Sequence, residues 1–535
     1  MTLLNVRNLG VMIHKTAVLR GISFGMAPGE IVAITGESGS GKSMTALSIM
    51  GLLPQGAQTS GTIDLMGDSL LTLKERDMCR LRGGRMGMVF QEPMTALNPV
   101  QNIGRQIEEH IYLHRPGHDA RDTAITLMKR VGLQDVPLTR YPHELSGGQR
   151  QRVVIAIAIA CSPKLLIADE PTTALDVTTQ AQILELLKRL AREDGMGLLM
   201  ITHDLAVVAE MSDRILVMKD GEIVEDGPTW SLFRNMQHPY TKALFAASRH
   251  KVDLPALDPA LLSRPLLQVQ KAVRRYPVAR RNLLGRRRRF EAVSDVTFAI
   301  NAGERIGLVG ESGCGKSTLT RAILGLERLQ KGKILVWGKP LGKAERRKMQ
   351  VVFQDPFGSF NPRHKVERLI CEPFHLVKDA PLGLDRREIV AETLLAVGLT
   401  PEDAQKYPHQ FSGGQRQRIA IARALITKPE LVIFDEAVSA LDVSIRAQIL
   451  DLIAELCRSH NLTYLFISHD LSVVRSVTDR VLVMQGGKIV EAGPTEQVFN
   501  APTHPYTQTL IAAAPRLPDV QDAAAQETPH EPDLV

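Results

Sequence analysis

Cysteine is scarce in this sequence of 535 residues, which contains only five, at positions 79, 161, 314, 371 and 457. No two of them show Cys-x-x-Cys spacing, so the sequence contains neither a zinc motif nor a disulfide framework. We expect all five thiols to be reduced and to take no part in function.

Long apolar runs are also missing. The longest, Val153–Cys161, follows directly on Arg152 and falls far short of the ~18 residues that a membrane-spanning helix needs. The first residues, Met1–Arg7, lack the basic, apolar and small-residue regions of a signal peptide. These two absences predict a cytoplasmic protein that does not span a membrane.

The excess of positive charge is confined to one short stretch. Eight arginines lie between Arg274 and Arg289, and without them the net charge would fall from +7 to −1. Such a patch differs from the basic stripe typical of nucleic-acid binding, so we expect no nucleic-acid partner. The simplest interpretation of the patch is a solvated insert; the alternative is attraction to anionic lipid headgroups.

One stretch occurs twice, as Leu145–Arg152 and as Phe411–Arg418, and both copies contain Ser-Gly-Gly-Gln-Arg-Gln-Arg. The two serines, at 146 and 412, are 266 residues apart, and other motifs recur at about this spacing. The sequence is therefore a tandem duplication of one domain. A composition of 44% hydrophobic and 23% charged residues fits two large soluble domains.

Each copy of this stretch predicts an anion site. Its glycines leave backbone amides open, and an apolar helical run follows, so the helix N-terminus adds positive potential. We expect a phosphate to bind there; the alternative is an ordinary loop whose serine caps the helix. The residues are Ser146, Gly147, Gly148 and Gln149, and Ser412, Gly413, Gly414 and Gln415.

A second motif, G-x-x-x-x-G-K-[ST], follows an apolar strand in both copies and leads into a helix. Its glycines let backbone amides surround phosphates, its lysine neutralises the β- and γ-phosphates, and its serine ligates Mg²⁺. The motif therefore predicts nucleotide binding. Its residues are Gly36, Glu37, Ser38, Gly39, Ser40, Gly41, Lys42 and Ser43, and Gly310, Glu311, Ser312, Gly313, Cys314, Gly315, Lys316 and Ser317.

Polar side chains follow three more predicted strands in each copy. The glutamine is placed to reach a metal and an attacking water, the aspartate to hold Mg²⁺, and the glutamate to deprotonate that water. The histidine is placed to contact a γ-phosphate. Each has an alternative when taken singly: a solvated glutamine, acids that cap the next helix, or a surface histidine. The residues are Gln91, Asp169, Glu170 and His203, and Gln354, Asp435, Glu436 and His469.

With these motifs in the same order in both halves, the sequence resembles the ATP-binding subunits of ABC transporters over nearly its whole length. The resemblance implies an α/β fold of tandem ABC ATPase domains of the P-loop NTPase class, each with a RecA-like core and a helical subdomain. It also implies ATP and Mg²⁺ as ligands and ATP hydrolysis as the reaction. We expect domains at 1–250 and 266–514, a linker at 251–265 and a disordered tail at 515–535.

Two such domains pair head to tail in this family. The Ser-Gly-Gly-Gln stretch of each half is called the signature in this family. The resemblance therefore implies that Lys42 and Glu170 face the signature at 412–415, and that Lys316 and Glu436 face the signature at 146–149.

Two positions depart from the family pattern. Adenine usually stacks on an aromatic residue ahead of the phosphate loop; the second copy offers Tyr276, but the first has Ile13 and His14 there. Many relatives also bind an iron–sulfur cluster near the C-terminus, but no cysteine follows Cys457, so we expect none here.

Finer features resemble importers of peptides and nickel. They are the turns at Asn98-Pro99 and Asn361-Pro362, and the endings His238–Thr241 and His504–Thr507, both His-Pro-Tyr-Thr. An alternative is that these endings are packed surface turns without a role. The fused layout is most similar to the ATPases of Yej-type oligopeptide importers, and next to those of glutathione importers.

The function implied by the resemblance is that of an energy-coupling ATPase for the import of oligopeptides or related small peptides. It would lie peripherally on the cytoplasmic face of the membrane, bind two separate permease subunits and depend indirectly on a solute-binding protein. The alternatives are import of glutathione or nickel, and a soluble twin-ABC protein that acts on the ribosome or DNA.

Overall fold

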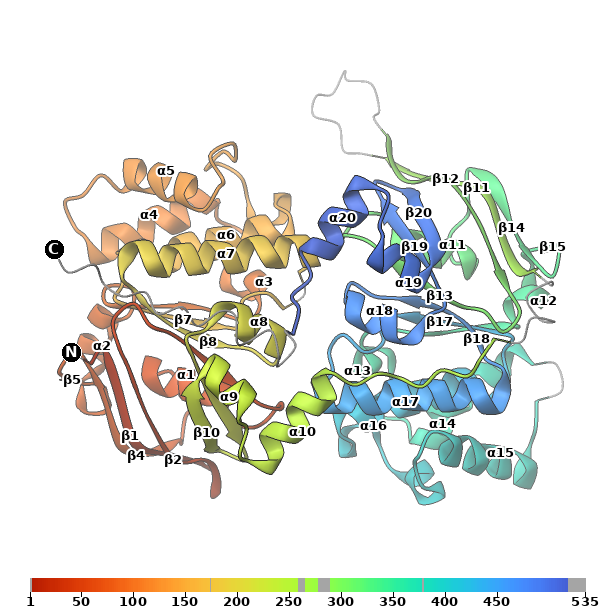
Figure 1. Ribbon diagram of the computed structural model, residues 1–535, viewed down its shortest axis with the longest axis horizontal. Helices are drawn as coiled ribbons and strands as arrows, with labels where there is room; N and C mark the ends of the chain where they lie inside the picture. Colours follow the sequence, from red (N-terminus) through yellow and green to blue (C-terminus); the bar gives the residue numbers. More distant parts are fainter. Residues whose placement is uncertain (1, 174, 258–264, 278–288, 378–379, 518–535) are drawn as a thin grey trace. The chain divides into compact units, whose positions relative to one another are not determined.

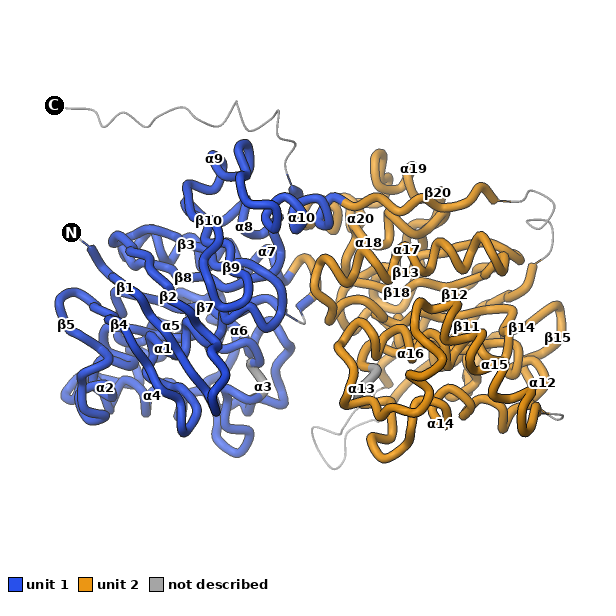
Figure 2. Tube along the Cα trace, turned by 90° about the horizontal axis from the view of Figure 1, so that it is seen from below, with its two compact units in different colours: residues 1–175, 179–249, 515–535 blue, residues 176–178, 250–514 orange. Residues whose placement is uncertain are grey.

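The computed structural model describes residues 2–173, 175–257, 265–277, 289–377 and 380–517. The chain divides into two compact units (Figure 2). The first contains residues up to 249, except 176–178, and the segment from 515 on. The second contains 250–514 together with 176–178. Much of the arginine patch (278–288) and the tail beyond 517 lie outside the described residues.

A six-stranded sheet forms the centre of the first unit. Its order is β10-β9-β3-β8-β7-β6, and all neighbours are parallel except β9 and β10. Strands β3, β7 and β8 are buried along their whole length, as expected for a parallel sheet covered on both faces. The strands are β3 Ile31–Thr35, β6 Met86–Val89, β7 Leu165–Asp169, β8 Gly197–Ile201, β9 Arg214–Lys219 and β10 Glu222–Pro228.

A smaller antiparallel sheet, of order β2-β1-β4-β5, packs its apolar side chains against the six-stranded sheet. Its strands are β1 Leu4–Ile13, β2 Thr16–Met26, β4 Gln58–Leu65 and β5 Asp68–Ser69. The helices of the unit are α1 Lys42–Met50, α2 Glu75–Leu81, α3 Pro93–Ala96, α4 Ile103–His114, α5 Ala120–Arg130, α6 Gly147–Ala158, α7 Val177–Asp194, α8 Leu205–Met211, α9 Thr229–Arg234 and α10 Pro239–Ser248.

The second unit repeats both sheets in the same order, β16-β17-β18-β13-β19-β20 and β12-β11-β14-β15. Its strands are β11 Pro265–Pro277, β12 Arg289–Asn301, β13 Arg305–Val309, β14 Lys331–Val336, β15 Lys339–Pro340, β16 Met349–Val352, β17 Leu431–Asp435, β18 Thr463–Ile467, β19 Arg480–Gln485 and β20 Lys488–Pro494. Its helices are α11 Lys316–Ile323, α12 Lys343–Arg346, α13 Pro356–Ser359, α14 Val366–Ile370, α15 Gly383–Ala396, α16 Gly413–Leu425, α17 Val443–His460, α18 Leu471–Val477, α19 Thr495–Asn500 and α20 Pro505–Ala512. The predicted tandem α/β fold is thus confirmed.

A helical part stands apart from the antiparallel sheet in each unit. Figure 1 shows α4, α5 and α6 on one side of the first unit, and α14, α15 and α16 on one side of the second. The sequence predicts one helical stretch at Ile103–Val131, whereas two helices form. The segment Arg115–Asp119 separates them, because Pro116 and Gly117 break the helix.

The hairpin of β1 and β2 continues the strand that the sequence predicts to begin at Leu3–Val6. Strand β1 continues to Ile13, and the chain reverses at His14 and Lys15, whose φ angles are 46° and 74°. Neither residue is a glycine, so the turn lacks the usual sequence signal.

Residues 250–257, which the sequence assigns mainly to a linker, lie along α17 of the second unit (Figure 1). His250 Nε2 is 2.6 Å from Asp451 Oδ1. Arg458 donates to the carbonyl oxygen of Asp253 at 2.5 Å, and Arg305 donates to that of Pro255 at 2.8 Å. Only the part of the connection at 258–264 lies outside the described residues.

The helices and the cysteines of the structure bear on two of the expectations from the sequence. Within the described ranges, every helix is too short or too polar to cross a bilayer. All five cysteines are free thiols, and four of them are buried.

An ion pair between a buried arginine and a half-buried aspartate suggests a test of stability in the second unit. The Arg305 side chain is 4% exposed and makes two hydrogen bonds, at 2.6 and 2.8 Å, to the Asp479 carboxylate. Because Arg305→Met leaves Asp479 and the Pro255 carbonyl without this donor, we expect a loss of about 3 kcal/mol in the free energy of unfolding.

Denaturant titration of the full chain measures this loss. The matched control is Ile31→Met, since Ile31 is fully buried at the corresponding position of the first unit and the change conserves volume. Equal losses in the free energy of unfolding from Arg305→Met and Ile31→Met would contradict a stabilising role of the Arg305–Asp479 pair.

Candidate functional site

The phosphate loop of each unit joins the central strand of the six-stranded sheet to a helix. In the first unit it leaves β3 at Gly36 and enters α1 at Lys42. Gly36 has a φ of 146°, and a Cβ there would lie 2.1 Å from the carbonyl oxygen of Met218. Gly310 repeats this, with a φ of 150° and a Cβ that would lie 2.2 Å from the Met484 carbonyl oxygen. Only glycine fits where the loop passes this close to the neighbouring strand.

The lysine of each loop is buried inside it. Lys42 is 7% exposed, and its Nζ donates to the carbonyl oxygens of Gly36 at 2.8 Å and Glu37 at 2.7 Å. Lys316 makes the equivalent bonds to Gly310 and Glu311 at 2.6 and 2.9 Å. The ammonium group is therefore held within the turn, where it places positive charge beside the open amides of a helix N-terminus.

The predicted polar residues meet at one edge of the sheet. Gln91 follows β6, Glu170 follows β7 and His203 follows β8, all at the carboxyl ends of parallel strands. The phosphate loop leaves β3 at the same edge, which is where open α/β sheets bind ligands. Gln354, Glu436 and His469 take the corresponding places after β16, β17 and β18.

Ser43 and Asp169 form a pair of oxygen groups next to the loop. The Ser43 hydroxyl donates to Asp169 Oδ1 at 3.1 Å, and Asp169 is 7% exposed. Burial raises the pKa of Asp169, the bond from Ser43 opposes this, and the neighbouring charge of Glu170 adds to it. Burial and the adjacent Glu436 likewise raise the pKa of Asp435. A hard cation such as Mg²⁺ fits this donor set, since it prefers carboxylate and hydroxyl oxygens.

The two glutamates adopt a backbone conformation that is rare for their residue type. The φ angles are 45° at Glu170 and 52° at Glu436, in the left-handed region. In each case the amide donates to the last residue of the next strand, Ile201 or Ile467, at 2.9 Å. The turn holds each carboxylate at the sheet edge, and such strain concentrates at functional sites.

Three side chains surround the Glu170 carboxylate. His203 Nδ1 lies 3.1 Å from Oε1, while Gln91 Nε2 and Thr173 Oγ1 donate to Oε2 at 2.8 and 2.9 Å. Burial raises the pKa of Glu170, but the bond and charge of His203, followed by the bond from Thr173, outweigh it and lower the pKa. The carboxylate is therefore ionised and able to accept a proton.

The second unit holds its glutamate differently. His469 Nδ1 is 3.6 Å from Glu436 Oε1, and His469 lowers the pKa of Glu436 against the effect of burial. Gln354 donates to Ser439 Oγ at 3.4 Å, and Ser439 donates to the backbone oxygen of Glu436 at 2.9 Å. Gln354 thus contacts the loop beside the glutamate, whereas Gln91 contacts the glutamate itself.

Sequence reasoning missed Thr173 and Ser439. Both carry a hydroxyl group three residues after the glutamate, and they are 266 residues apart like the signature serines. That repeated hydroxyl is the signal that would have found them.

The signature serines cap helices, as the alternative interpretation of this stretch holds. Ser146 Oγ accepts from the Gln149 amide at 3.2 Å, and Gln149 Oε1 accepts from the Ser146 amide at 3.1 Å. Ser412 and Gln415 form the same capping box at the start of α16. The cap leaves Gly147 and Gly148 in the first turn of α6, so anion binding there stays a prediction.

Tyr276 lies near the end of β11 and already has protein partners. Its hydroxyl donates to Glu327, and the Arg274 guanidinium lies 4.7 Å from its ring centroid. Ile13 ends β1 in the first unit, and His14 lies in the turn that follows. The adenine-stacking role of Tyr276 stays a prediction.

Comparison with known proteins gives two family matches. The family model described as "ABC transporter" matches residues 19–173 and 293–439. The one described as "Oligopeptide/dipeptide transporter, C-terminal region" matches residues 224–257 and 490–534.

Relatives match over almost the whole chain. The glutathione import ATP-binding protein GsiA of Escherichia coli K12 is 46% identical over 564 residues, which cover 96% of this chain and 89% of the relative. The peptidoglycan transport ATP-binding protein YejF of Agrobacterium fabrum is 46% identical over 546 residues, which cover 98% of each.

Thr173 donates to the carboxylate of Glu170, whereas Ser439 donates to the backbone oxygen of Glu436. This difference predicts that the two hydroxyl groups affect the pH dependence of hydrolysis differently. In a chain with Glu436→Gln, Thr173→Val removes a hydrogen bond to the Glu170 carboxylate, so the pKa of Glu170 rises. The acid limb of the hydrolysis rate, which lies below the ordinary glutamate range because the pKa of Glu170 is lowered, then moves to higher pH.

The matched control is Ser439→Ala in a chain with Glu170→Gln. Because Ser439 bonds the backbone oxygen of Glu436 and not its carboxylate, we expect the acid limb of this chain to stay in place. Phosphate release measured across the pH range tests both variants. Equal shifts of the acid limb in the two variants would contradict a specific effect of Thr173 on the Glu170 carboxylate.

Proposed function

This chain belongs to the ABC transporter family, and from that premise we propose that it is the energy-coupling ATPase of an importer for oligopeptides or related small peptides. The observation that carries the proposal is the double set of groups at one sheet edge: phosphate loop, Asp-Glu pair, glutamine and histidine in each unit. Two such sets on a chain without a membrane-crossing helix in its described part suit a subunit that drives separate permeases.

Glu170 and Glu436 are the proposed general bases. Glu170 takes a proton from a water molecule that attacks the γ-phosphorus of ATP; the bond to the bridging oxygen breaks and leaves ADP and phosphate. His203, 3.1 Å from the carboxylate, and Gln91, 2.8 Å from it, orient that base. His469, 3.6 Å from Glu436 Oε1, has the same proposed role, while Gln354 acts on Glu436 through Ser439.

The remaining residues of the set bind the nucleotide and its metal. Lys42 and Lys316, with the amides of their loops, hold the phosphates. Mg²⁺, when bound, would neutralise phosphate charge. In this proposal it is held by Ser43, Asp169 and Gln91 in the first half and by Ser317, Asp435 and Gln354 in the second.

The division into nucleotide-binding domains at 1–250 and 266–514 is part of the proposal. The proposal also includes the completion of each ATP site by the signature of the other half. That pairing is a prediction from the family resemblance.

Small peptides are the proposed solutes because the family model and the relatives both favour them. The oligopeptide/dipeptide transporter region matches the end of each half. The relatives are named for glutathione, which is a tripeptide, and for peptidoglycan, which contains peptides. No relative described above is named for action on the ribosome or DNA.

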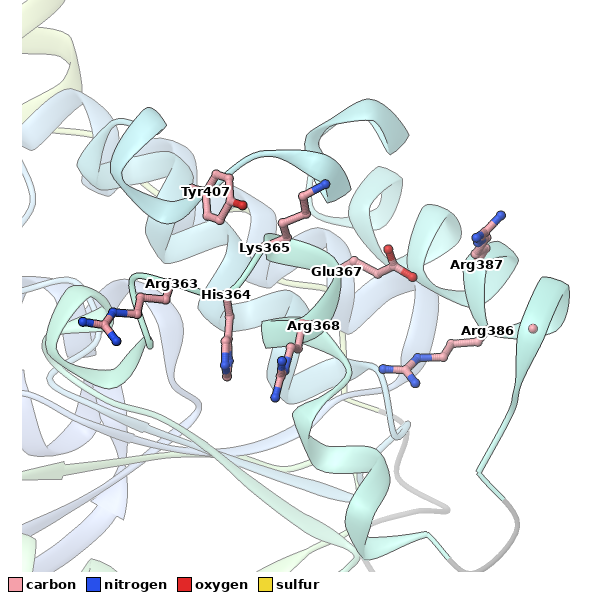
Figure 3. A pocket seen from close by; sticks show the side chains of 9 residues that line it. Arg363, His364, Lys365, Glu367, Arg368, Arg386, Arg387 and Tyr407 are labelled. Atoms are coloured by element: carbon pink, nitrogen blue, oxygen red, sulfur yellow. The ribbon is translucent and has the colours of Figure 1, made fainter.

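A basic cavity in the helical part of the second unit supports a protein partner. It has a volume of about 670 Å³ (Figure 3). Arg368 from α14 and Arg386 from α15 reach the same cavity, and the Nε of Arg386 is buried without a hydrogen-bond partner. The lining residues are Arg363, His364, Lys365, Glu367, Arg368, Gly383, Arg386, Arg387 and Tyr407.

The corresponding positions of the first unit are much less basic. Val100, Gln101 and Asn102 stand where the second unit has Arg363, His364 and Lys365. The two helical parts thus present different charges, which suits two different permease subunits at the cytoplasmic membrane face. We propose that the basic cavity receives an acidic segment of one of them.

Substitution of the glutamates tests the ATPase assignment. We expect Glu170→Gln with Glu436→Gln to lower the hydrolysis rate about 10²- to 10⁴-fold while ATP still binds, since only the base is lost. Phosphate release and equilibrium binding of ATP measure the two effects. Unchanged hydrolysis in the double variant would refute the proposed bases.

Charge reversal tests the partner site. In a C-terminally tagged chain purified from native membranes in mild detergent, we expect two polytopic permeases in comparable amounts by mass spectrometry. Arg363→Glu with Arg368→Glu should lower the recovery of one of them about tenfold, because an acidic segment is then repelled.

The internal control for this experiment is Arg105→Glu, at the position in the first unit that matches Arg368. We expect it to have a smaller effect and ATP binding to be unchanged in all variants. Recovery of ribosomal proteins or DNA instead of permeases would favour the other class of twin-ABC proteins.

A further inference from the structure

The His-Pro-Tyr-Thr ending of each half reaches back to the phosphate loop of the same unit. The backbone amide of Glu37 donates to the Tyr240 hydroxyl at 2.9 Å, across 203 residues of sequence. The amide of Glu311 donates to the Tyr506 hydroxyl at the same distance, across 195 residues. The contact thus occurs independently in both units.

The second residue of each loop is fixed on both sides by these contacts. In the first unit the Glu37 amide bonds Tyr240, while its carbonyl oxygen accepts from Lys42 Nζ at 2.7 Å. Gly36, directly before it, has the left-handed φ that only glycine adopts easily. The tyrosine therefore holds the point at which the chain turns from the strand into the loop.

The tyrosine is itself held by the start of its helix. His238 Nδ1 accepts from the Tyr240 amide at 3.2 Å and caps α10, and Pro239 occupies the first helical position. His504 makes the same bond to the Tyr506 amide at 3.2 Å at the start of α20.

A carboxylate on the preceding strand anchors this cap. Glu225 on β10 accepts from the amides of Gln237 and His238 at 2.7 and 3.2 Å. Glu491 on β20 accepts from the amides of Thr503 and His504 at 2.8 and 3.1 Å. Burial opposes ionisation of Glu491, but these bonds lower its pKa to about 2, so the anchor stays charged at neutral pH.

The environment of the tyrosine keeps its hydroxyl group neutral. Tyr506 is 8% exposed, and burial raises its pKa far above the ordinary value. The hydroxyl is thus a constant hydrogen-bond acceptor for the loop amide over the physiological pH range.

We propose that Tyr240 and Tyr506 are positioning residues that hold each phosphate loop in its phosphate-binding conformation, so that the C-terminal segment of each half sets the nucleotide affinity of that half. The inference rests on the proposed ATPase function. A loop that is already shaped for its ligand binds more tightly, because less order has to be created on binding.

Removal of the hydroxyl alone tests the proposal. We expect Tyr240→Phe and Tyr506→Phe each to raise the Kd and KM for ATP of their own unit roughly three- to tenfold, the range of one hydrogen bond. The kcat should change less than about twofold, since the tyrosine does not touch the reacting atoms. To separate the units in the hydrolysis assay, each variant is made in a chain whose other unit carries Glu→Gln at 170 or 436. In the binding assay, the other unit carries Lys→Ala at 42 or 316 instead.

Hydrogen exchange gives a readout that does not depend on ATP. Peptides containing Glu37 should exchange faster in Tyr240→Phe, and those containing Glu311 should exchange faster in Tyr506→Phe, each without change in the other unit. Tyr112→Phe is the matched control, because Tyr112 is 71% exposed. If Tyr506→Phe fails to fold, Tyr240, which is more exposed, supplies the test.

Lys42→Ala and Lys316→Ala separate failure of this inference from failure of the proposed function. If neither lysine variant alters ATP binding, the proposed function fails, although faster exchange would still support the contact. If both weaken binding while the tyrosine variants leave either Kd or exchange unchanged, the positioning role is overturned.

Discussion

A buried ammonium group inside a turn of backbone carbonyl groups is the interaction on which each unit depends. A buried cation is unfavourable unless hydrogen bonds and nearby dipoles compensate for lost water. Lys42 and Lys316 obtain this compensation only because Gly36 and Gly310 allow the chain to turn tightly against the neighbouring strand. The central strand, the glycine turn and the first helix are therefore required together, and the remaining site residues are placed by the sheet that these elements define.

The two units share a backbone plan and differ in their side chains. Both glutamates have the same left-handed conformation, yet Gln91 bonds Glu170 whereas Gln354 bonds Ser439. The helical parts differ more, since basic residues line the cavity of the second unit. Fusion in one chain lets two copies diverge in this way while each is always made together with its counterpart.

The sequence predicts the sheet-edge site well because it depends on local signals. Gln91, Glu170 and His203 each follow an apolar strand, and parallel strands bring such positions to one edge. Two other features lack a local signal of this kind: nothing periodic marks the bond between Glu37 and Tyr240, and the turn at His14 and Lys15 lacks glycine. That Gln354 bonds Ser439, whereas Gln91 bonds the glutamate, depends on side-chain conformation, which motif spacing does not encode.

The attachment of residues 250–257 along α17 shortens the tether between the units. The first unit ends at Arg249 and the second begins at His250, so each unit experiences the other at an effective concentration on the order of millimolar. Dilution in the cell cannot separate them. Any association between the halves is therefore first-order, and its equilibrium is independent of how much of the protein is made.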